Sequence, residues 1–80
     1  MTTPEDRYKF LVDYTSSKVV EMLVNEHELT LQDALLSWHN SETFEKLVDK
    51  STAMYIESPM YVYNILKEEF KRGTIRGLTE

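Results

Sequence analysis

Two histidines are the residues of this chain best suited to metal binding or acid–base chemistry. His27 stands in the run NEHEL and His39 in the run SWHNSE. Two imidazoles do not complete an ordinary zinc site, and the sequence lacks the HExxH spacing that places two histidines on one helical face. Glu42 follows His39 by three residues, but an expected helix break separates them. We therefore expect both histidines to be exposed or to cap helices, and we expect no metal site.

The other candidates for catalysis are a serine–lysine run and a pair of adjacent carboxylates. Ser16, Ser17 and Lys18 fall in the middle of an expected helix, where adjacent side chains point in different directions. A catalytic serine needs a strained turn and an oxyanion hole beside it. Glu68 and Glu69 are predicted to form a solvated helix face. Without cysteine or a glycine-rich phosphate loop, the sequence predicts neither an enzyme nor a bound cofactor.

Length and composition indicate one small helical domain. Eighty residues suffice for a single domain, and a chain of this size buries only about 60% of the surface that its unfolded form exposes. The sequence has no cysteine, so disulfides cannot supply stability. Two glycines and two prolines are too few for the turns of a small β-sandwich or barrel. Close helix packing or a second subunit is the remaining route to stability.

Charge and hydropathy restrict the partners. The net charge is −5, and an acidic protein repels nucleic-acid phosphates unless its positive charges are gathered in one place. Lys67, Lys71, Arg72 and Arg76 do lie close together, but acidic residues are interspersed, so nucleic acid is not expected as a partner. The first ten residues lack the apolar core of a signal peptide, and apolar runs reach only three residues. We expect a cytoplasmic protein that does not enter a membrane.

The spacing of apolar residues predicts four helices, one long and three shorter. Their expected ranges are about 4–25, 31–39, 42–50 and 59–72. Residues with side-chain oxygens precede each range and are the expected N-caps: Thr3, Thr30, Asn40 or Ser41, and Ser58. Residues 51–57 are compatible with an extended piece, a loop or a helical turn. The predicted fold is an all-α, compact bundle in a single domain, 1–80, with frayed ends at 1–3 and 74–80.

The buried face of each helix is predicted by the same spacing. In the second helix the expected buried residues are Leu31, Leu35 and Trp38, with Ala34 beside them. In the fourth helix they are Val62, Ile65, Leu66 and Phe70. The remaining aromatic and methionine side chains of the run YIESPMYVY lie outside this stripe. We expect Tyr55, Met60, Tyr61 and Tyr63 to be exposed contact residues of a protein interface, because such side chains are enriched at interface cores.

The first helix is long for a domain of this size, and we expect it to overhang the three short helices. An overhanging amphipathic helix exposes an apolar stripe, and such stripes mark interaction sites. We therefore expect a homodimer that forms through the first helix, or through the first and fourth helices. The predicted function is that of a small, acidic protein–protein interaction module, which binds itself or another small protein.

An alternative function is suggested by the short helices at 31–50, whose lengths resemble a helix-turn-helix. In that case the second helix of the pair would enter the major groove. Its exposed residues would include three acids, Glu42, Glu45 and Asp49, against Lys46 and Lys50. These acids oppose contact with phosphates. The alternative function that the helix pair suggests is that of an antitoxin-like or DNA-associated regulator.

One stretch of the chain resembles a group of short, all-helical bacterial proteins that are grouped as a domain of unknown function. The resemblance covers about residues 8–72. It rests on Asp33-Ala34-Leu35 and on Ser58-Pro59 followed by Tyr61-Val62-Tyr63. These proteins have no established activity, so the resemblance implies a helical fold and a binding role but assigns no functional residue.

Overall fold

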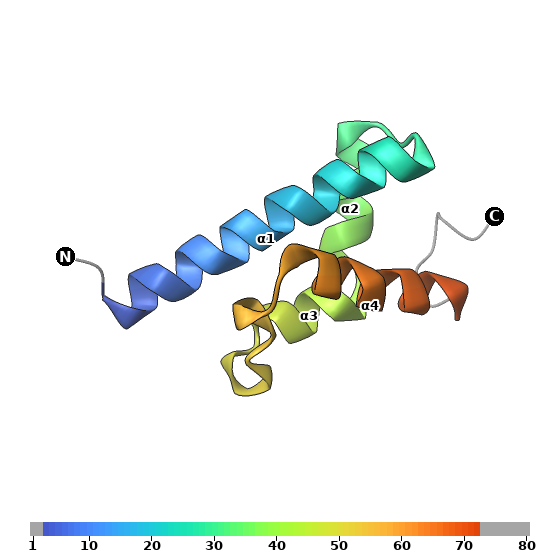
Figure 1. The fold of residues 1–80 in the computed structure, drawn as a ribbon. Helices are drawn as coiled ribbons and strands as arrows, with labels where there is room; N and C mark the ends of the chain where they lie inside the picture. The colour runs from blue at the N-terminus through green and yellow to red at the C-terminus, as the bar shows by residue number, and fades with distance from the viewer. Residues whose placement is uncertain (1–2, 73–80) are drawn as a thin grey trace.

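The computed structural model of the chain describes residues 3–72 and places four α-helices and two short 3₁₀ helices there (Figure 1). The elements in chain order are α1 Pro4–His27, α2 Leu31–His39, α3 Glu42–Val48, η1 Lys50–Thr52, η2 Met54–Ile56 and α4 Pro59–Lys71. Residues 3–72 contain no strand. The predicted all-α bundle of four helices is confirmed, and each predicted helix is present. The expected frayed ends at 1–2 and 74–80 lie outside the described residues.

The helices begin where the sequence predicted, because a side-chain oxygen caps each one. Each capping oxygen lies 3.0–3.2 Å from the backbone nitrogen three residues later, and the four caps are Thr3, Thr30, Ser41 and Ser58. Thr3 is thus an ordered cap and not part of a frayed end. Such a cap satisfies one of the N–H groups that the first helical turn leaves unpaired.

Residues 50–57 form two tight turns, which decides among the extended, loop and helical alternatives. Asp49 starts the first turn, where its Oδ1 accepts hydrogen bonds from the backbone nitrogen and hydroxyl of Ser51 at 3.0 and 2.7 Å. These hydrogen bonds lower the pKa of Asp49. Ala53 separates the turns with a left-handed φ of 57°. The left-handed residue reverses the chain, so that α4 returns along α3.

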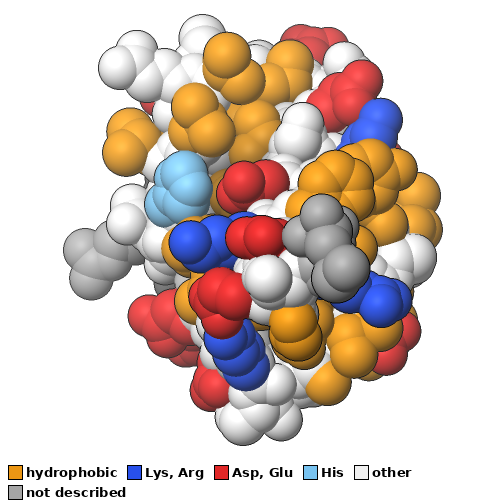
Figure 2. Space-filling model, turned by 90° about the vertical axis from the view of Figure 1, so that its left-hand side faces the viewer, with side chains coloured by type: hydrophobic (Ala, Val, Ile, Leu, Met, Phe, Trp, Pro, Cys, Tyr) orange, Lys and Arg blue, Asp and Glu red, His pale blue; other side chains and the backbone are white. Residues whose placement is uncertain are grey.

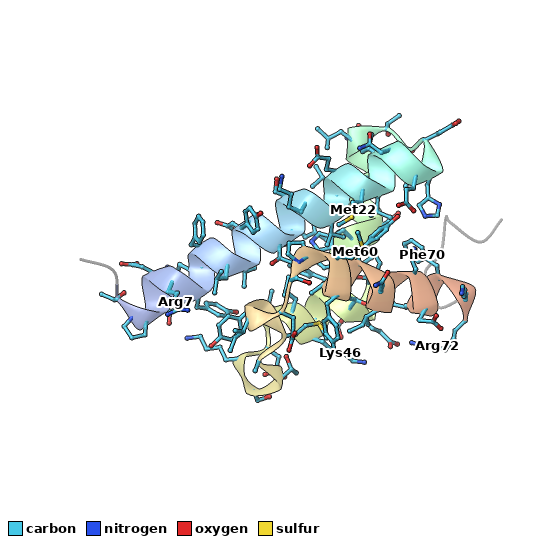
Figure 3. All side chains as sticks on the ribbon, in the orientation of Figure 1. Arg7, Met22, Lys46, Met60, Phe70 and Arg72 are labelled. Atoms are coloured by element: carbon cyan, nitrogen blue, oxygen red, sulfur yellow. The ribbon has the colours of Figure 1, made fainter. Side chains whose placement is uncertain are left out.

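The long helix α1 crosses the whole molecule, and the other elements pack along one side of it (Figure 1). Helices α2 and α4 pack against it, α3 packs against α4, and η2 contacts both α1 and α3. Figure 3 shows Met22 on the side of α1 that faces α4. The side of α1 that none of these elements covers remains open to solvent.

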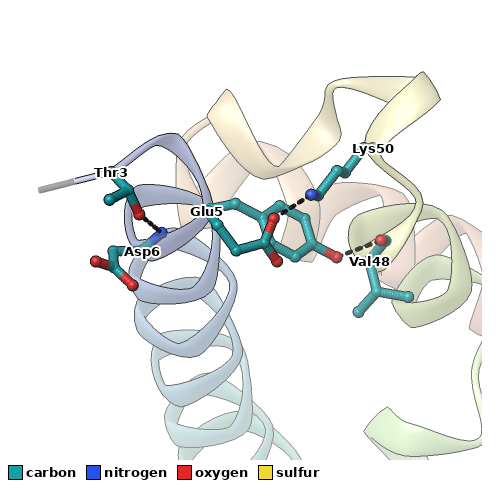
Figure 4. Close-up of polar contacts among 6 residues, drawn as sticks. Thr3, Glu5, Asp6, Val48 and Lys50 are labelled. Atoms are coloured by element: carbon teal, nitrogen blue, oxygen red, sulfur yellow. Dashed lines mark hydrogen bonds and ion pairs between the residues drawn. The ribbon is translucent and has the colours of Figure 1, made fainter.

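The beginning of α1 is attached to the turn region by polar contacts, which Figure 4 shows, and by one aromatic contact. Lys50 Nζ lies 2.5 Å from Glu5 Oε1, and the hydrogen bond from Lys50 lowers the pKa of Glu5. The Tyr8 hydroxyl donates to the Val48 carbonyl oxygen, and the Tyr8 ring meets Tyr55 edge-on at 5.0 Å. The beginning of α1 therefore contacts the turn region and does not project freely from the domain. The side of α1 that faces away from the turn region is not covered by another described element.

The core is formed by side chains from all four helices. Its buried apolar members are Val19, Val20, Leu23, Ala34, Trp38, Leu47, Val62, Tyr63 and Leu66. Val62 and Leu66 are core residues as predicted, whereas Ile65 and Phe70 are only partly buried. Two predictions for α2 are wrong, because Leu31 and Leu35 are 62% and 38% exposed. The nine-residue α2 turns Ala34 and Trp38 toward the core. Leu31 and Leu35 each lie three residues before one of these, about 60° around the helix, and so fall at the edge of the buried face.

Glu69 contradicts the prediction of a solvated acidic face on α4. Its side chain is buried, and its carboxylate accepts hydrogen bonds from three donors at the start of α3. The donors are Glu42 N at 2.8 Å, Thr43 N at 3.0 Å and Thr43 Oγ1 at 2.7 Å. Glu68, its neighbour, is exposed as predicted. Glu69 therefore joins α4 to α3 by satisfying N–H groups that α3 cannot pair within itself.

Tyr63 is also placed differently from the prediction, which had it exposed at an interface. It is fully buried, and its hydroxyl donates a 3.0 Å hydrogen bond to Glu26 Oε1. Burial, together with the hydrogen bond to Glu26, raises the pKa of Tyr63. Val62 and Leu66 flank it in the core. Tyr63 is thus a core residue that connects α4 to the end of α1.

The raised pKa of Tyr63 predicts a specific loss of stability at high pH. The folded chain holds the phenol proton more tightly than the unfolded chain, whose tyrosine pKa is about 10. The contribution is therefore fully present below pH 10 and is lost as the pH rises further, by up to about 1.4 kcal/mol per pH unit. We expect urea unfolding between pH 8 and 11 to show a steeper decline for the native chain than for Tyr63→Phe. Parallel declines for the two chains would contradict this role of Tyr63.

Candidate docking surface

A groove of about 630 Å³ lies between α1 and α2. Its apolar lining consists of Val20, Val24, Leu31, Leu35 and Trp38. Its polar border consists of Asp13, Ser16, Ser17, Glu21, Asn25 and His39. Ligand pockets in proteins commonly have volumes of about 300–1,000 Å³ and such a mixture of apolar walls and few polar groups. The groove is therefore large enough to receive side chains of another molecule.

An exposed aromatic pair continues the groove along α1 toward its beginning. Phe10 and Tyr14 are 65% and 46% exposed, and their rings stack with centroids 6.1 Å apart and an interplanar angle of 16°. Phe10, Ser17 and Val24 follow one another at seven-residue intervals, which places them on nearly the same line of the helix. Figure 2 views the molecule from the side of the N-terminus. Hydrophobic side chains are exposed in several areas of the molecular surface seen there.

Two polar atoms that border the groove have no hydrogen-bond partner within residues 3–72. Trp38 is fully buried, yet its indole Nε1 donates to no acceptor in residues 3–72. The hydroxyl Oγ of Ser16 is likewise shielded from solvent and unpaired within the described part of the chain. An unsatisfied buried donor costs about 1–3 kcal/mol, and such atoms often become paired in a complex or by water. The groove therefore contains unsatisfied hydrogen-bonding capacity beside its apolar walls.

The charges on this face of α1 are balanced, although the whole chain is acidic. Between residues 9 and 25 the charged residues are Lys9, Asp13, Lys18 and Glu21, two of each sign. Lys18 Nζ lies 3.8 Å from Glu21 Oε1 and 5.8 Å from the centroid of the Tyr14 ring. The net charge of −5 is therefore carried by the residues outside 9–25.

Of the four interface residues predicted from the sequence, two are exposed, one is half-buried and one is in the core. Met60 and Tyr61 are 54% and 48% exposed, Tyr55 is half-buried against Tyr8, and Tyr63 is in the core. Sequence reasoning overlooked the exposed aromatic pair on α1 and the exposed leucines of α2. The sequence signal that could have indicated this surface is the seven-residue spacing of Phe10, Ser17 and Val24. These positions lie away from the face of α1 that the apolar period marks as buried.

The histidines lie at the surface, as predicted. His27 meets the edge of Phe70 with ring centroids 5.7 Å apart, and His39 meets Phe44 at 4.9 Å. Within residues 3–72 no group of three or more potential ligands is placed to hold a metal ion. Over the same range, no helix has the length and apolar character needed to cross a bilayer.

The helix pair at 31–50 has features that oppose contact with DNA. The first turn of α3 would face the nucleic acid in a helix-turn-helix, but its N–H groups are already occupied by the buried carboxylate of Glu69. Glu42 and Glu45 are exposed on this helix, and α3 has only seven residues. Negative charge at this position repels phosphates.

No protein-family model, curated protein or solved structure matches this chain. The resemblance to small helical bacterial proteins stays a prediction. The groove and its aromatic extension are therefore the observations from which a function can be inferred.

Proposed function

We propose that this chain is a small interaction module that pairs with a second copy of itself through the outer face of α1. The observation that supports this proposal is the combination of a projecting aromatic pair and an apolar groove on one face of the same helix. Phe10 and Tyr14 project at one end, and the groove beside Val24 and Leu31 lies at the other. Two copies that lie antiparallel bring each aromatic pair to the groove of the other.

The middle of this face suits a two-fold axis. Ser17 lies seven residues after Phe10 and seven before Val24, so an axis at Ser17 places Phe10 of each copy opposite Val24 of the other. Ser16 and Ser17 are small, which allows the two α1 helices to approach closely. A symmetric interface of this type satisfies both copies with the same patch, as most protein dimers do.

The size of the face is that of a small, reversible dimer interface. Helix α1 is about 36 Å long and about 10 Å wide, and α2 adds about 14 Å by 10 Å beside part of it, so the face covers roughly 500 Å² on each copy. A standard stable interface buries about 800 Å² per partner. The four charged residues between 9 and 25 sum to zero, so this face lacks the net negative charge of the rest of the chain, although the axis sets Asp13 of one copy level with Glu21 of the other. The absence of cysteine is in keeping with a reducing, cytoplasmic setting.

Substitution of Phe10 by serine is expected to weaken the dimer strongly. Burying a phenylalanine side chain contributes about 1.5–3 kcal/mol, and the dimer contains two copies of Phe10, which is 65% exposed in the single chain. A loss of about 3 kcal/mol per dimer raises the dissociation constant roughly a hundredfold. Sedimentation equilibrium over a range of concentrations measures this constant.

The matched control is Tyr61→Ser, which removes an aromatic ring of 48% exposure from α4. We expect this variant to dimerise like the native chain. Circular dichroism of both variants establishes that the helices are intact. A dimer that is lost in Tyr61→Ser and kept in Phe10→Ser would move the interface to α4. A native chain that is monomeric at all concentrations would overturn the proposal.

A further inference from the structure

We propose that a second pocket, at the beginning of α1, binds a small organic monocarboxylate with an apolar body, and that Arg7 recognises the carboxylate. The pocket lies between α1 and η2 and has a volume of about 310 Å³. Its lining consists of Pro4, Arg7, Tyr8, Leu11, Tyr55 and Ile56. Figure 3 shows Arg7 on the side of α1 on which the turn region lies. None of these residues belongs to the groove or to the aromatic pair, so the inference does not rest on the proposed dimer.

Arg7 supplies an unused positive charge to this pocket. Within residues 3–72 its guanidinium forms no ion pair and no hydrogen bond. Nearby Glu5 is already paired with Lys50, whose Nζ lies 2.5 Å from its Oε1. A guanidinium presents its N–H donors in a planar fork that matches the two oxygens of a carboxylate. Arg7 is therefore suited to bind a carboxylate from outside the chain.

The remaining walls of the pocket are apolar and are held in place by contacts within the chain. The ring of Tyr8 meets that of Tyr55 edge-on at 5.0 Å, and the Tyr8 hydroxyl donates to the Val48 carbonyl oxygen. Leu11 is half-buried, whereas Ile56 is 61% exposed. A ligand body that covers Ile56 removes apolar surface from water, which favours binding. Apolar walls with few polar groups are typical of ligand pockets.

Size and charge together select the class of ligand. The volume lies near the lower end of the range of about 300–1,000 Å³ for ligand pockets, which suits a body of one ring or a short chain. One arginine balances one negative charge. A phosphate monoester carries about 1.5–2 negative charges at neutral pH, and the rest of this acidic chain repels the excess. A monocarboxylate is therefore favoured over a phosphate ester and over a neutral molecule of the same shape.

The proposal is tested by titrating the native chain with 4-phenylbutanoate and recording ¹H–¹⁵N spectra. We expect the backbone amide signals of Tyr8, Leu11 and Ile56 to shift, with a dissociation constant on the order of 1 mM for so small a ligand. In Arg7→Gln the constant should rise about tenfold, because a charge-assisted hydrogen bond is lost. Arg7 is exposed, so the fold should be retained, and circular dichroism checks this.

The matched control is Lys9→Gln, which removes the same charge from the same helix at a residue outside the lining. Its constant should stay within about twofold of the native value, because an exposed charge outside the pocket contributes little. The neutral analogue 4-phenylbutan-1-ol should bind about tenfold more weakly than the acid.

Three results would overturn the proposal and leave the dimer untouched. The first is the absence of shifts at concentrations up to about 20 mM, well above the expected constant. The second is equal binding by the alcohol or by Arg7→Gln, since either would mean that Arg7 does not recognise the carboxylate. The third is a set of shifts confined to groove residues such as Val24 and Leu31, because the ligand would then occupy the groove between α1 and α2.

Discussion

Replacement of Glu69 by alanine is expected to lower the free energy of unfolding by about 3–4 kcal/mol. The carboxylate is buried and accepts three hydrogen bonds from Glu42 and Thr43. Hydrogen bonds to a charged group contribute about 1.5–3 kcal/mol each, and a buried donor left without an acceptor costs about 1–3 kcal/mol. Alanine removes the acceptor for all three donors, while water entering the site recovers part of the loss.

The loss is large for a domain of this size. Small domains have about 5–15 kcal/mol of stability in total, and 1 kcal/mol corresponds to about 4–8 °C in the melting temperature. We therefore expect the melting temperature of Glu69→Ala to fall by roughly 12–25 °C, measured by circular dichroism at 222 nm. The control is Glu68→Ala, whose carboxylate is exposed and lies 3.6 Å from Lys71 Nζ. Exposed ion pairs contribute about 0–1 kcal/mol, so this variant should melt within a few degrees of the native chain.

The contrast between the two variants tests the position of Glu69 directly. A second variant, Glu69→Gln, keeps the size of the side chain and one acceptor oxygen but places an NH₂ group near a backbone donor. Its stability should fall between those of the native chain and Glu69→Ala. Equal melting temperatures for Glu68→Ala and Glu69→Ala would mean that Glu69 is solvated, as the sequence pattern alone predicted.

The helix bounds were predictable because local rules determine them. Ser58 followed by Pro59 illustrates this point, since a capping hydroxyl and a proline in the first turn specify a helix start without reference to the rest of the chain. The same holds for Thr3 before Pro4. The end of α1 at His27 was predicted about two residues early, because Glu28 adopts a left-handed φ of 55° that sequence patterns do not indicate for glutamate.

The surroundings of individual side chains were less predictable, because they depend on how the helices cross. Leu31 and Leu35 are as apolar as Trp38, and periodicity alone could not decide which of them α2 turns inward. Glu69 is buried because the start of α3, 26 residues earlier in the chain, lies beside it. Contacts over such separations cannot be derived from spacing within one helix. The groove between α1 and α2 was missed for this reason, whereas the seven-residue spacing of Phe10, Ser17 and Val24 is present in the sequence, and a role for the long helix in association was predicted.

The second large effect is expected from a cysteine at the proposed symmetry axis. The native chain has no cysteine, so Ser17→Cys introduces a single thiol. In an antiparallel pair whose axes lie about 8–10 Å apart, facing Cα atoms approach to roughly 4–5 Å. Disulfides require Cα separations of about 4.4–6.8 Å. Two Ser17→Cys chains should therefore form a disulfide across the axis under mild oxidation.

The control places the thiol on the competing surface. Asn64 is exposed on α4 beside Tyr61, so Asn64→Cys offers an exposed thiol on a helix outside the proposed interface. Oxidation in urea provides a further comparison, because unfolded chains meet only by random collision. Preferential cross-linking of Ser17→Cys in buffer, lost in urea, would then report the folded interface.

The measurement that tests the central claim most directly is the rate of disulfide formation in Ser17→Cys at micromolar concentration, followed on non-reducing gels. Self-association through α1 predicts nearly complete conversion to a covalent dimer, much faster than for Asn64→Cys. If Ser17→Cys is oxidised no faster than Asn64→Cys, the two copies do not meet at Ser17 and the proposed dimer is wrong.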